Sequence, residues 1–243
     1  LVPMAGMSQT SVSTRFLADL SPAARLWLAT PVLFMIPLFW DLTGLDGWVM
    51  QQLADHNGFP LRHQWLLEKV MHDAARHLAT VLYIGVLVMV WRPVGPFRRL
   101  SRILRAEAAV GVTLGLLAVR WMKRLSMTSC PWDLQDFGGV ARHVSHWNWG
   151  TLDGGPGQCF PGGHASAALA FVALALPWLT SVVGEERRMG RQWLLAVLWG
   201  GLALGLTQTL RGAHFPSHTL WTALVCWGVA LANHQVFRWV RRA

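Results

Sequence analysis

Residues 193–236 read WLLAVLWGGLALGLTQTLRGAHFPSHTLWTALVCWGVALANHQV, and this stretch decides the fold. It holds two apolar runs, 193–210 and 219–236, with a polar connection between them. Each run approaches the roughly 20 mostly apolar residues that a helix needs to cross a bilayer. Polar side chains are tolerated at that depth only when they are paired or at the surface. The stretch therefore predicts two membrane helices joined by a turn at the membrane face.

Four further apolar segments precede this pair: 24–42, 78–91 (beginning near 74), 106–122 and 165–183. The sequence thus predicts an all-α protein, a bundle of six transmembrane helices forming a single domain over 1–243. Only 14% of the residues are charged and 53% are hydrophobic, whereas a soluble domain carries about 25% charged residues. Although the net charge is +9, the basic residues flank apolar runs, so we expect a membrane and no nucleic acid as partner.

The arginines indicate an orientation. They gather in the second and fourth connections and in the tail: Arg92, Arg98, Arg99, Arg102, Arg105, Arg187, Arg188, Arg191, Arg238, Arg241 and Arg242. Positively charged loops stay in the cytoplasm, so both termini, including the segment 1–23, are expected there. The first apolar run begins too late for a cleavable signal peptide. We expect a multi-pass protein of the cytoplasmic (inner) membrane, and the arginine-rich composition suggests a bacterium.

Two connections on the opposite side are long enough to fold. Residues 45–73 carry apolar side chains at roughly helical spacing, which fits either short interfacial helices or an ordinary loop. Residues 123–164 form the longest connection, rich in Gly, Trp and His. Long structured loops often carry function, so this one is expected to be a periplasmic active-site loop.

Three polar stretches occur at the predicted outer helix ends: KRLSMTSCPWD at 123–133, PGGHAS at 161–166 and QTLRGAHFPSH at 208–218. Together they resemble the motifs of the PAP2 (type 2 phosphatidic acid phosphatase, vanadium-haloperoxidase-like) superfamily, K-x6-R-P, P-S-G-H and S-R-x5-H-x3-D. Lys123 begins the first motif, His164 ends the second and His214 is the histidine of the third. The chain departs from the pattern at Cys130, at Thr207-Gln208 and at His218.

The resemblance implies a lipid phosphatase of the integral-membrane branch and a role for each matching residue. His214 would be the nucleophile that forms a phosphohistidine, and His164 would be the general acid. Lys123 and Arg211 would hold the phosphoryl oxygens. The backbone N–H groups of Gly162 and Gly163 would approach the phosphate at a helix N-terminus. No metal and no cofactor is implied.

The departures leave two roles open. Arg211, one turn after Gln208, can supply the missing guanidinium, and Arg120 and Arg142 are further candidates. His218 replaces an aspartate and lies four residues after His214, so it can face the nucleophile on a helical turn. An imidazole carries no negative charge. We therefore expect weaker stabilisation of the phosphohistidine intermediate unless the loop brings in a carboxylate. The candidates for that carboxylate are Asp133 and Asp136.

The outer loop raises further expectations. Cys130 and Cys159 each lie beside a motif outside the cytoplasm, where disulfides persist, so we predict a disulfide, a free pair being the alternative. His143 and His146 have a metal-like spacing but also fit a surface loop. The segment HWNWG at 146–150 is expected to be an interfacial plug or lid, or to grip an acyl chain or a sugar.

The predicted function is hydrolysis of a phosphate monoester or pyrophosphate on a lipid of the periplasmic leaflet. Candidate substrates are a polyprenyl pyrophosphate, the phosphate of lipid A, phosphatidylglycerol phosphate and phosphatidic acid. One alternative is a phosphotransferase that passes the phosphoryl group to another lipid. A catalytically degenerate binding or transport protein is another, and a haem or metal membrane protein is the most distant. The oligomeric state is not predicted.

Overall fold

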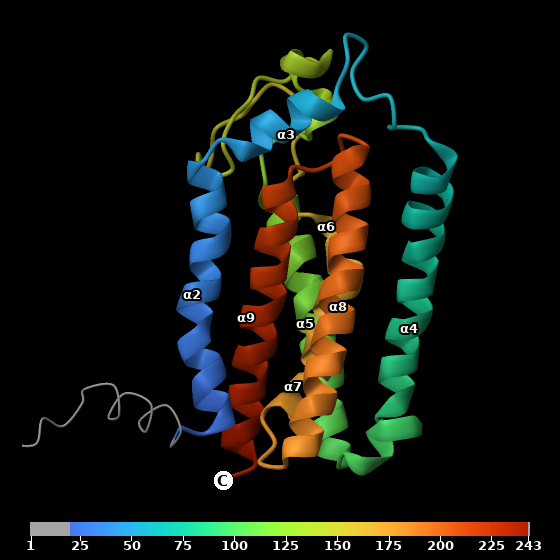
Figure 1. Ribbon diagram of the computed structural model, residues 1–243, viewed down its shortest axis with the longest axis vertical. Coiled ribbons are helices and arrows are strands. Elements are labelled where there is room, and N and C mark those ends of the chain that lie inside the picture. Colours follow the sequence, from blue (N-terminus) through green and yellow to red (C-terminus); the bar gives the residue numbers. More distant parts are fainter. Residues whose placement is uncertain (1–19, 243) are drawn as a thin grey trace, which may run out of the picture.

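The computed structural model describes residues 20–242, and over that range the chain is all-helical, as predicted. Long segments run side by side along the molecule (Figure 1): α2 (Pro22–Leu42), α4 (Ala75–Met89), α5 (Arg102–Leu125), α8 (Gly184–Leu210) and α9 (Pro216–Val240). A further segment consists of α6 (Gly163–Leu169), η5 (Ala170–Leu174) and α7 (Leu176–Leu179). The short elements are α3 (Leu45–Leu53), the π-helix η1 (Leu66–Ala74), and the 3-10 turns η2 (Gly95–Arg99), η3 (Pro131–Asp133) and η4 (Gln135–Phe137).

Local signals explain where the long helices begin. The Ser21 hydroxyl caps α2 by accepting the N–H of Ala24 at 3.2 Å. The Ser101 hydroxyl caps α5 by accepting the N–H of Leu104 at 3.3 Å. Pro216 is the first residue of α9, where its missing N–H is not needed.

Within the described residues, three helices are long and apolar enough to cross a membrane: α2, α8 and α9. Large apolar side chains lie exposed on the surfaces of α2, α4 and α8, among them Val32, Phe39, Val81, Leu82 and Trp199. Water would not favour so much exposed hydrocarbon, whereas lipid does. These surfaces mark a membrane protein.

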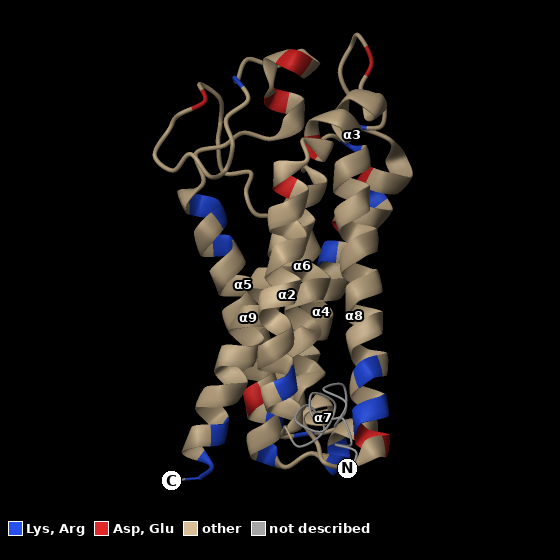
Figure 2. Cartoon of the chain, turned by 60° about the vertical axis from the view of Figure 1, so that its left-hand side comes forward, with Lys and Arg blue, Asp and Glu red and all other residues tan. Residues whose placement is uncertain are grey.

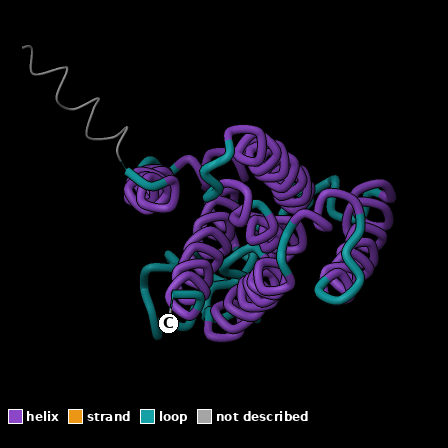
Figure 3. The backbone as a smooth tube through the Cα atoms, turned by 90° about the horizontal axis from the view of Figure 1, so that it is seen from below, coloured by secondary structure: helices purple, strands orange, loops and turns teal. Residues whose placement is uncertain are grey.

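The count of six transmembrane helices stays a prediction. The fourth predicted segment, 165–183, breaks into α6, η5 and α7, and most of these residues are buried among the other helices. Small residues allow this close packing: a Cβ at Gly201 would lie 2.3 Å from a methyl carbon of Leu169. The helix α5 is long enough but carries charged residues at both ends. Seen end on, α2 and α4 are the outermost helices on the two sides (Figure 3).

The stretch 45–73 is only partly what the sequence suggested. One short helix forms there, α3, but the second helical part, η1, continues directly into α4. Between them, residues 54–65 form a loop with bends and turns.

The two ends of the molecule differ in charge. Lysine and arginine gather at the end where α7 lies, and most acidic residues lie toward the α3 end (Figure 2). At the basic end, Glu107 of α5 is buried and binds two residues near the C-terminal end of α9. His234 Nδ1 lies 2.5 Å from one carboxylate oxygen of Glu107, and Arg241 donates to the other. A buried carboxylate needs such partners, so this cluster ties α5 to α9.

Candidate active site

Three chain segments bring the motif residues to the α3 end of the bundle. Lys123 lies in the last turn of α5, and His164 lies in the first turn of α6. Arg211 caps α8, His214 follows in the turn, and His218 lies in the first turn of α9. The structure therefore places together residues that are up to 95 positions apart in the sequence.

The turn between α8 and α9 positions His214. Gly212 has φ 74°, and a Cβ there would lie 2.3 Å from ring atoms of Phe59, so this position requires glycine. The N–H groups of Ala213 and His214 donate to the Gln208 carbonyl at 2.8 and 3.3 Å. These bonds close the end of α8 and hold the His214 backbone in one place.

His214 and His218 are both buried and face each other, with their Nδ1 atoms 3.3 Å apart. The contact requires that one of the two nitrogens carries a proton and donates a hydrogen bond, which the other nitrogen accepts. Burial lowers the pKa of His214 well below its ordinary value, and the charges of Lys123, His218 and His164 lower it further. His214 is therefore a neutral imidazole at neutral pH.

His164 has a partner that the sequence did not reveal. Its ring stacks on the ring of His72, with centroids 3.7 Å apart and planes 14° apart. Its Nε2 lies 3.4 Å from the His72 carbonyl oxygen, and His72 Nδ1 lies 2.8 Å from an Asp73 carboxylate oxygen. His72 belongs to η1, and no local pattern in the sequence marks its pairing with a residue 92 positions away.

Two cations lie close to the histidines. Lys123 is near enough for its charge to act on both His214 and His218. A Cβ at Gly163 would lie 3.4 Å from Lys123 Cδ, so the lysine side chain passes beside the N-terminus of α6. Arg211 is 6% exposed, and its charge acts on His164.

Arg211 is fixed by its own contacts. Its Nε donates to the Arg62 carbonyl at 2.9 Å, and its Nη1 lies 3.5 Å from Gln208 Oε1. Gln208, which replaces the motif arginine, is 3% exposed. Its amide Nε2 is buried with no partner among the described residues. A buried amide donor without a partner is costly, so this group is a candidate ligand of a phosphate oxygen.

Three predicted residues lie differently from the expectation. Arg120 is exposed on α5, and Arg142 is exposed in the loop. The N–H of Gly162 donates to the His218 carbonyl at 3.2 Å, and the Thr222 hydroxyl donates to the Gly162 carbonyl at 3.0 Å. Gly162 thus joins the start of α6 to α9, and the expectation that its N–H meets a phosphate is corrected.

The predicted disulfide between Cys130 and Cys159 is present. It fastens the long loop against His214, because Cys159 Sγ lies 3.3 Å from His214 Nδ1. The ligand atoms of Cys130, Cys159 and His214 lie close enough together to suggest a metal site. Since both sulfurs are in the disulfide, they offer no thiolate to an ion.

Asp153 holds the loop from inside. This aspartate is 2% exposed and accepts hydrogen bonds from the Ser129 N–H at 2.5 Å and from the Ser129 hydroxyl at 3.0 Å. It also accepts the N–H of Gly155 at 2.9 Å. No sequence pattern revealed this role, because an aspartate before two glycines is typical of an ordinary turn.

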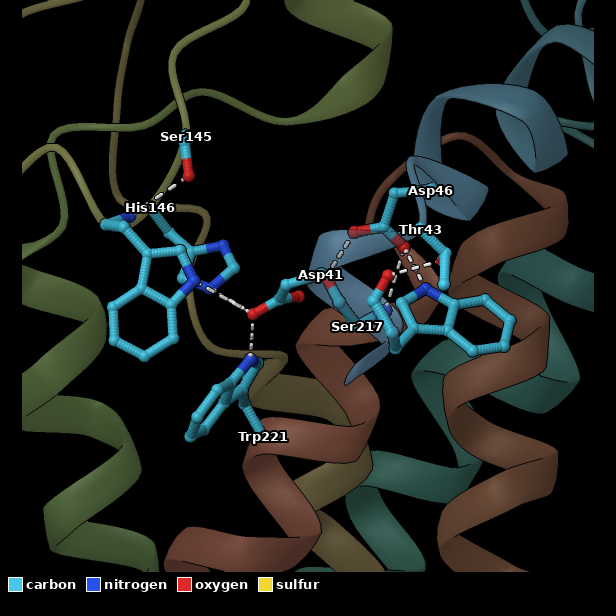
Figure 4. A network of polar contacts seen from close by, with 9 residues as sticks. Asp41, Thr43, Asp46, Ser145, His146, Ser217 and Trp221 are labelled. Carbon is cyan, nitrogen blue, oxygen red and sulfur yellow. Dashed lines mark hydrogen bonds and ion pairs between the residues drawn. The ribbon is translucent and has the colours of Figure 1, made fainter. Parts of the chain in front are cut away.

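Asp41, at the end of α2, lies in the middle of a polar network (Figure 4). Its Oδ2 accepts hydrogen bonds from His146 Nε2 at 3.1 Å and from the indole N–H groups of Trp147 and Trp221, both at 2.9 Å. Its Oδ1 is buried and has no partner among the described residues. The HWNWG segment is therefore anchored at Trp147, whereas Trp149 is 81% exposed.

Asp46 of α3 reaches the start of α9 (Figure 4). Its Oδ1 accepts the Trp40 indole N–H at 2.8 Å and the Ser217 N–H at 3.0 Å, and its Oδ2 accepts the Ser217 hydroxyl. Burial raises the pKa of Asp46 above its ordinary value. Because Ser217 precedes His218, α3 is tied to the histidine pair.

A cavity of about 190 Å³ lies between these carboxylates and His218; its polar lining includes Asp41, Asp46, His143, His146 and His218. The His146 ring meets the His218 ring edge to face, with centroids 6.1 Å apart. The carboxylates near the histidine pair are thus Asp41 and Asp46, and the expectation of Asp133 or Asp136 is corrected. Asp136 is exposed, and Asp133 interacts with Trp132 and Arg62.

Comparison with known proteins identifies a family. No curated protein and no solved structure matches the chain. The family model described as the PAP2 superfamily matches residues 105–242, more than half of the chain and the part that holds Lys123, His164, His214 and His218. The chain belongs to the PAP2 superfamily.

Proposed function

We propose that this protein hydrolyses a phosphate monoester or pyrophosphate of a membrane lipid through a phosphohistidine at His214. The superfamily suggests phosphatase activity in general. The observation that carries the proposal is the buried contact between His214 and His218, with His164, Lys123 and Arg211 close by. A neutral buried imidazole among cations is suited to attack an anionic phosphorus centre.

In the first step, the Nε2 lone pair of His214 attacks phosphorus while its Nδ1 faces His218. Burial lowers the pKa of His164 to about 4 in the protein alone, and the bound phosphate anion favours its protonated form. The bond from phosphorus to the lipid oxygen breaks, and the protonated His164 gives its proton to that oxygen. Lys123, Arg211 and the Gln208 amide bind the phosphoryl oxygens, whose charge spreads in the transition state. The lipid alcohol, or the lipid phosphate from a pyrophosphate, is the first product.

In the second step, water attacks phosphorus and the bond from phosphorus to His214 breaks. The neutral His164 takes the proton of that water and regains its acid form. Inorganic phosphate leaves, and both histidines return to their starting states. Over both steps, one ester and one water give one alcohol and one phosphate.

The phosphorylated imidazole is cationic when both of its nitrogens are substituted, and it needs negative charge nearby. His218 offers only a neutral acceptor in place of the motif aspartate. We infer that Asp41 and Asp46 supply this charge across the cavity that His218 lines. His146 is the link, since it contacts both Asp41 and the His218 ring.

We also propose that six segments cross the membrane and that the site faces the periplasm, with both termini in the cytoplasm. The arginine-rich end of the molecule supports this orientation, because such ends stay in the cytoplasm. The disulfide beside His214 supports it independently, because disulfides persist outside the cytoplasm.

The test is phosphate release in detergent from phosphatidic acid, phosphatidylglycerol phosphate, a polyprenyl pyrophosphate and lipid A, with wild type beside His214→Ala. We expect release from one class of lipid and its loss in the variant. If no phosphate appears but a second lipid becomes phosphorylated, the protein is a phosphotransferase. If a folded wild-type protein does neither, the catalytic proposal is wrong and a binding role takes its place.

A further inference from the structure

A groove of about 680 Å³ lies between α4 and α8, with α6 and η5 at its base. Every residue that lines it is apolar or glycine. On the outer wall, Leu78 and Leu82 of α4 are 58% and 52% exposed, so the groove opens where the helices meet lipid. Apart from the indole N–H of Trp193, no lining side chain can form a hydrogen bond with a polar or charged ligand. A hydrocarbon chain needs no such partner and is suited to this lining.

The groove leads to His164 along each of its walls. On α6, Ala167 and Ala168 line the groove three and four residues after His164, on the same face of the helix. On α4, the lining begins at Ala75, directly after the helix turn that carries His72. His72 stacks on His164, so the end of the groove lies near these two stacked rings.

The third wall of the groove, on α8, also leads toward the site. On α8, Leu204 is the lining residue nearest to the site in sequence, and Arg211 follows it by seven residues, about two helical turns. His164 and Arg211 therefore lie about one and two helical turns from the nearest residues that line the groove. A second apolar groove of about 330 Å³ lies between α2, α8 and α9, and α4 does not contribute to its lining.

We propose that the groove between α4 and α8 holds the hydrocarbon chain of the substrate while its phosphate lies among the histidines. This inference rests on the proposed function and adds the direction of binding. The hydrocarbon is part of the leaving group, and His164 is the group that protonates the leaving oxygen. A chain that leaves His164 along the groove places that oxygen beside its proton donor.

The length of the groove favours a long chain. Its α4 wall extends from Ala75 to Met89, about 20 Å of helix. The hydrocarbon core of a bilayer is about 30 Å thick, so one leaflet is about 15 Å deep. A chain seated along the whole groove therefore reaches beyond its own leaflet, and selectivity should rise with chain length.

One glycine allows a clean test. Gly85 of α4 lines the groove, and a Cβ there would meet no atom within 4 Å. The Cβ of a leucine at this position therefore meets no atom of the protein, and the rest of its side chain takes up space in the groove. Leucine also favours the helix more than glycine does. Gly228 of α9 has the same open surroundings but lies outside the groove, so Gly228→Leu is the matched control.

The measurement is kcat/KM for alkyl phosphates from butyl to hexadecyl phosphate in detergent. We expect Gly85→Leu to lower the ratio of hexadecyl to butyl phosphate hydrolysis about tenfold, the loss that follows when about two methylenes leave an apolar site. The ratio should not change in Gly228→Leu. An unchanged ratio in Gly85→Leu means that the groove holds bulk lipid only and overturns the inference.

A second readout does not depend on turnover. Hexadecyl phosphate with a diazirine in its chain should crosslink to α4 and α8, and these adducts should decrease in Gly85→Leu but not in Gly228→Leu. Adducts confined to α2 and α9, or adducts that persist in Gly85→Leu, contradict the inference. If wild type hydrolyses neither an alkyl phosphate nor any lipid of the panel above, yet crosslinks in the groove, the proposed function fails and the binding inference stands.

Discussion

At the scale of single residues, the site departs from the family motif at His218, and we infer that residues from outside the motif compensate for the missing aspartate. His218 replaces an aspartate and lies 3.3 Å from His214. The nearby carboxylates are Asp41 and Asp46, which come from α2 and α3 and line the same cavity as His218. Those helices lie outside the region matched by the family model. We infer that these two carboxylates take the place of the motif aspartate near His214.

Asp41→Asn tests this compensation. The change removes one negative charge but keeps the size of the side chain, so we expect kcat to fall about tenfold with little change in KM. A defect in binding would instead raise KM. Asp136→Asn, at an exposed position, is the control for loss of negative charge. Equal kinetics of the two variants would show that Asp41 supports only the fold.

The protonation of His214 predicts a pH profile. Burial and the charge of Lys123 lower the pKa of His214 below its ordinary value of 6.5. As the pH falls, the imidazole therefore remains neutral and nucleophilic to a lower pH than an ordinary histidine does. The acid limb of kcat/KM should therefore lie below pH 6.5. Lys123→Met removes a positive charge and should move the limb to higher pH. NMR titration of the His214 ring in both proteins checks the shift without reference to rate, and identical titrations would contradict it.

At the scale of elements, the site depends on the turn between α8 and α9 and on the loop that covers it. Neither the turn nor the loop is held by the repeating backbone hydrogen bonds of a helix. The turn relies on Gly212 and on the end of α8, and the loop relies on a disulfide and on the buried Asp153. Each of these supports can be removed separately.

Gly212→Ala should destabilise the protein and reduce hydrolysis. Its φ is 74°, and a Cβ would lie 2.3 Å from the Phe59 ring, so backbone strain and a clash both act. Strain alone costs on the order of 1 kcal/mol. Gly138→Ala isolates the strain, because Gly138 has φ 86° with nothing within 4 Å. Thermal unfolding in detergent should show a larger loss for Gly212→Ala, and equal losses would exclude a role for Phe59.

Removal of the disulfide should loosen the loop beside the nucleophile. The two cysteines are 29 residues apart, for which the chain-entropy model gives roughly 3–4 kcal/mol of stabilisation. We expect the double variant Cys130→Ser/Cys159→Ser to unfold at lower temperature and to release phosphate more slowly. Cys226→Ser, at a buried position outside the loop, controls for the loss of sulfur. Unchanged activity in the double variant would show that the loop holds its place without the bond.

At the scale of the whole molecule, the charge difference between the two ends predicts the orientation in the membrane. Val140, in the loop over the site, is 71% exposed, and Val182, at the opposite end, is 84% exposed. With Cys226→Ser as background, Val140→Cys should react with an impermeant maleimide in intact cells with a permeable outer membrane. Val182→Cys should react only after the inner membrane is opened. The reverse pattern would place the site in the cytoplasm.

Much of the fold could be predicted from the chain's apolar runs, because a membrane helix is a local property of about 20 residues. The runs indicated helices close to α2, α4, α5, α8 and α9. They did not indicate that the fourth run packs inside the bundle as α6, η5 and α7, since lipid and protein interiors select the same apolar residues. That difference depends on which neighbours cover the helix.

The sequence by itself determined the class of protein, the order of the three motifs, the nucleophile candidate and the disulfide. The class of protein follows from the apolar runs, and the motifs with their nucleophile candidate follow from the resemblance to a known family. The disulfide follows from the expected location of both cysteines outside the cytoplasm. Only the tertiary structure decided that Arg211, rather than Arg120 or Arg142, is buried by the histidines, and that His72 stacks on His164. It alone showed that Asp41 binds Trp221, 180 positions away. Such contacts arise when helices far apart in sequence pack together, and no local pattern specifies the partner.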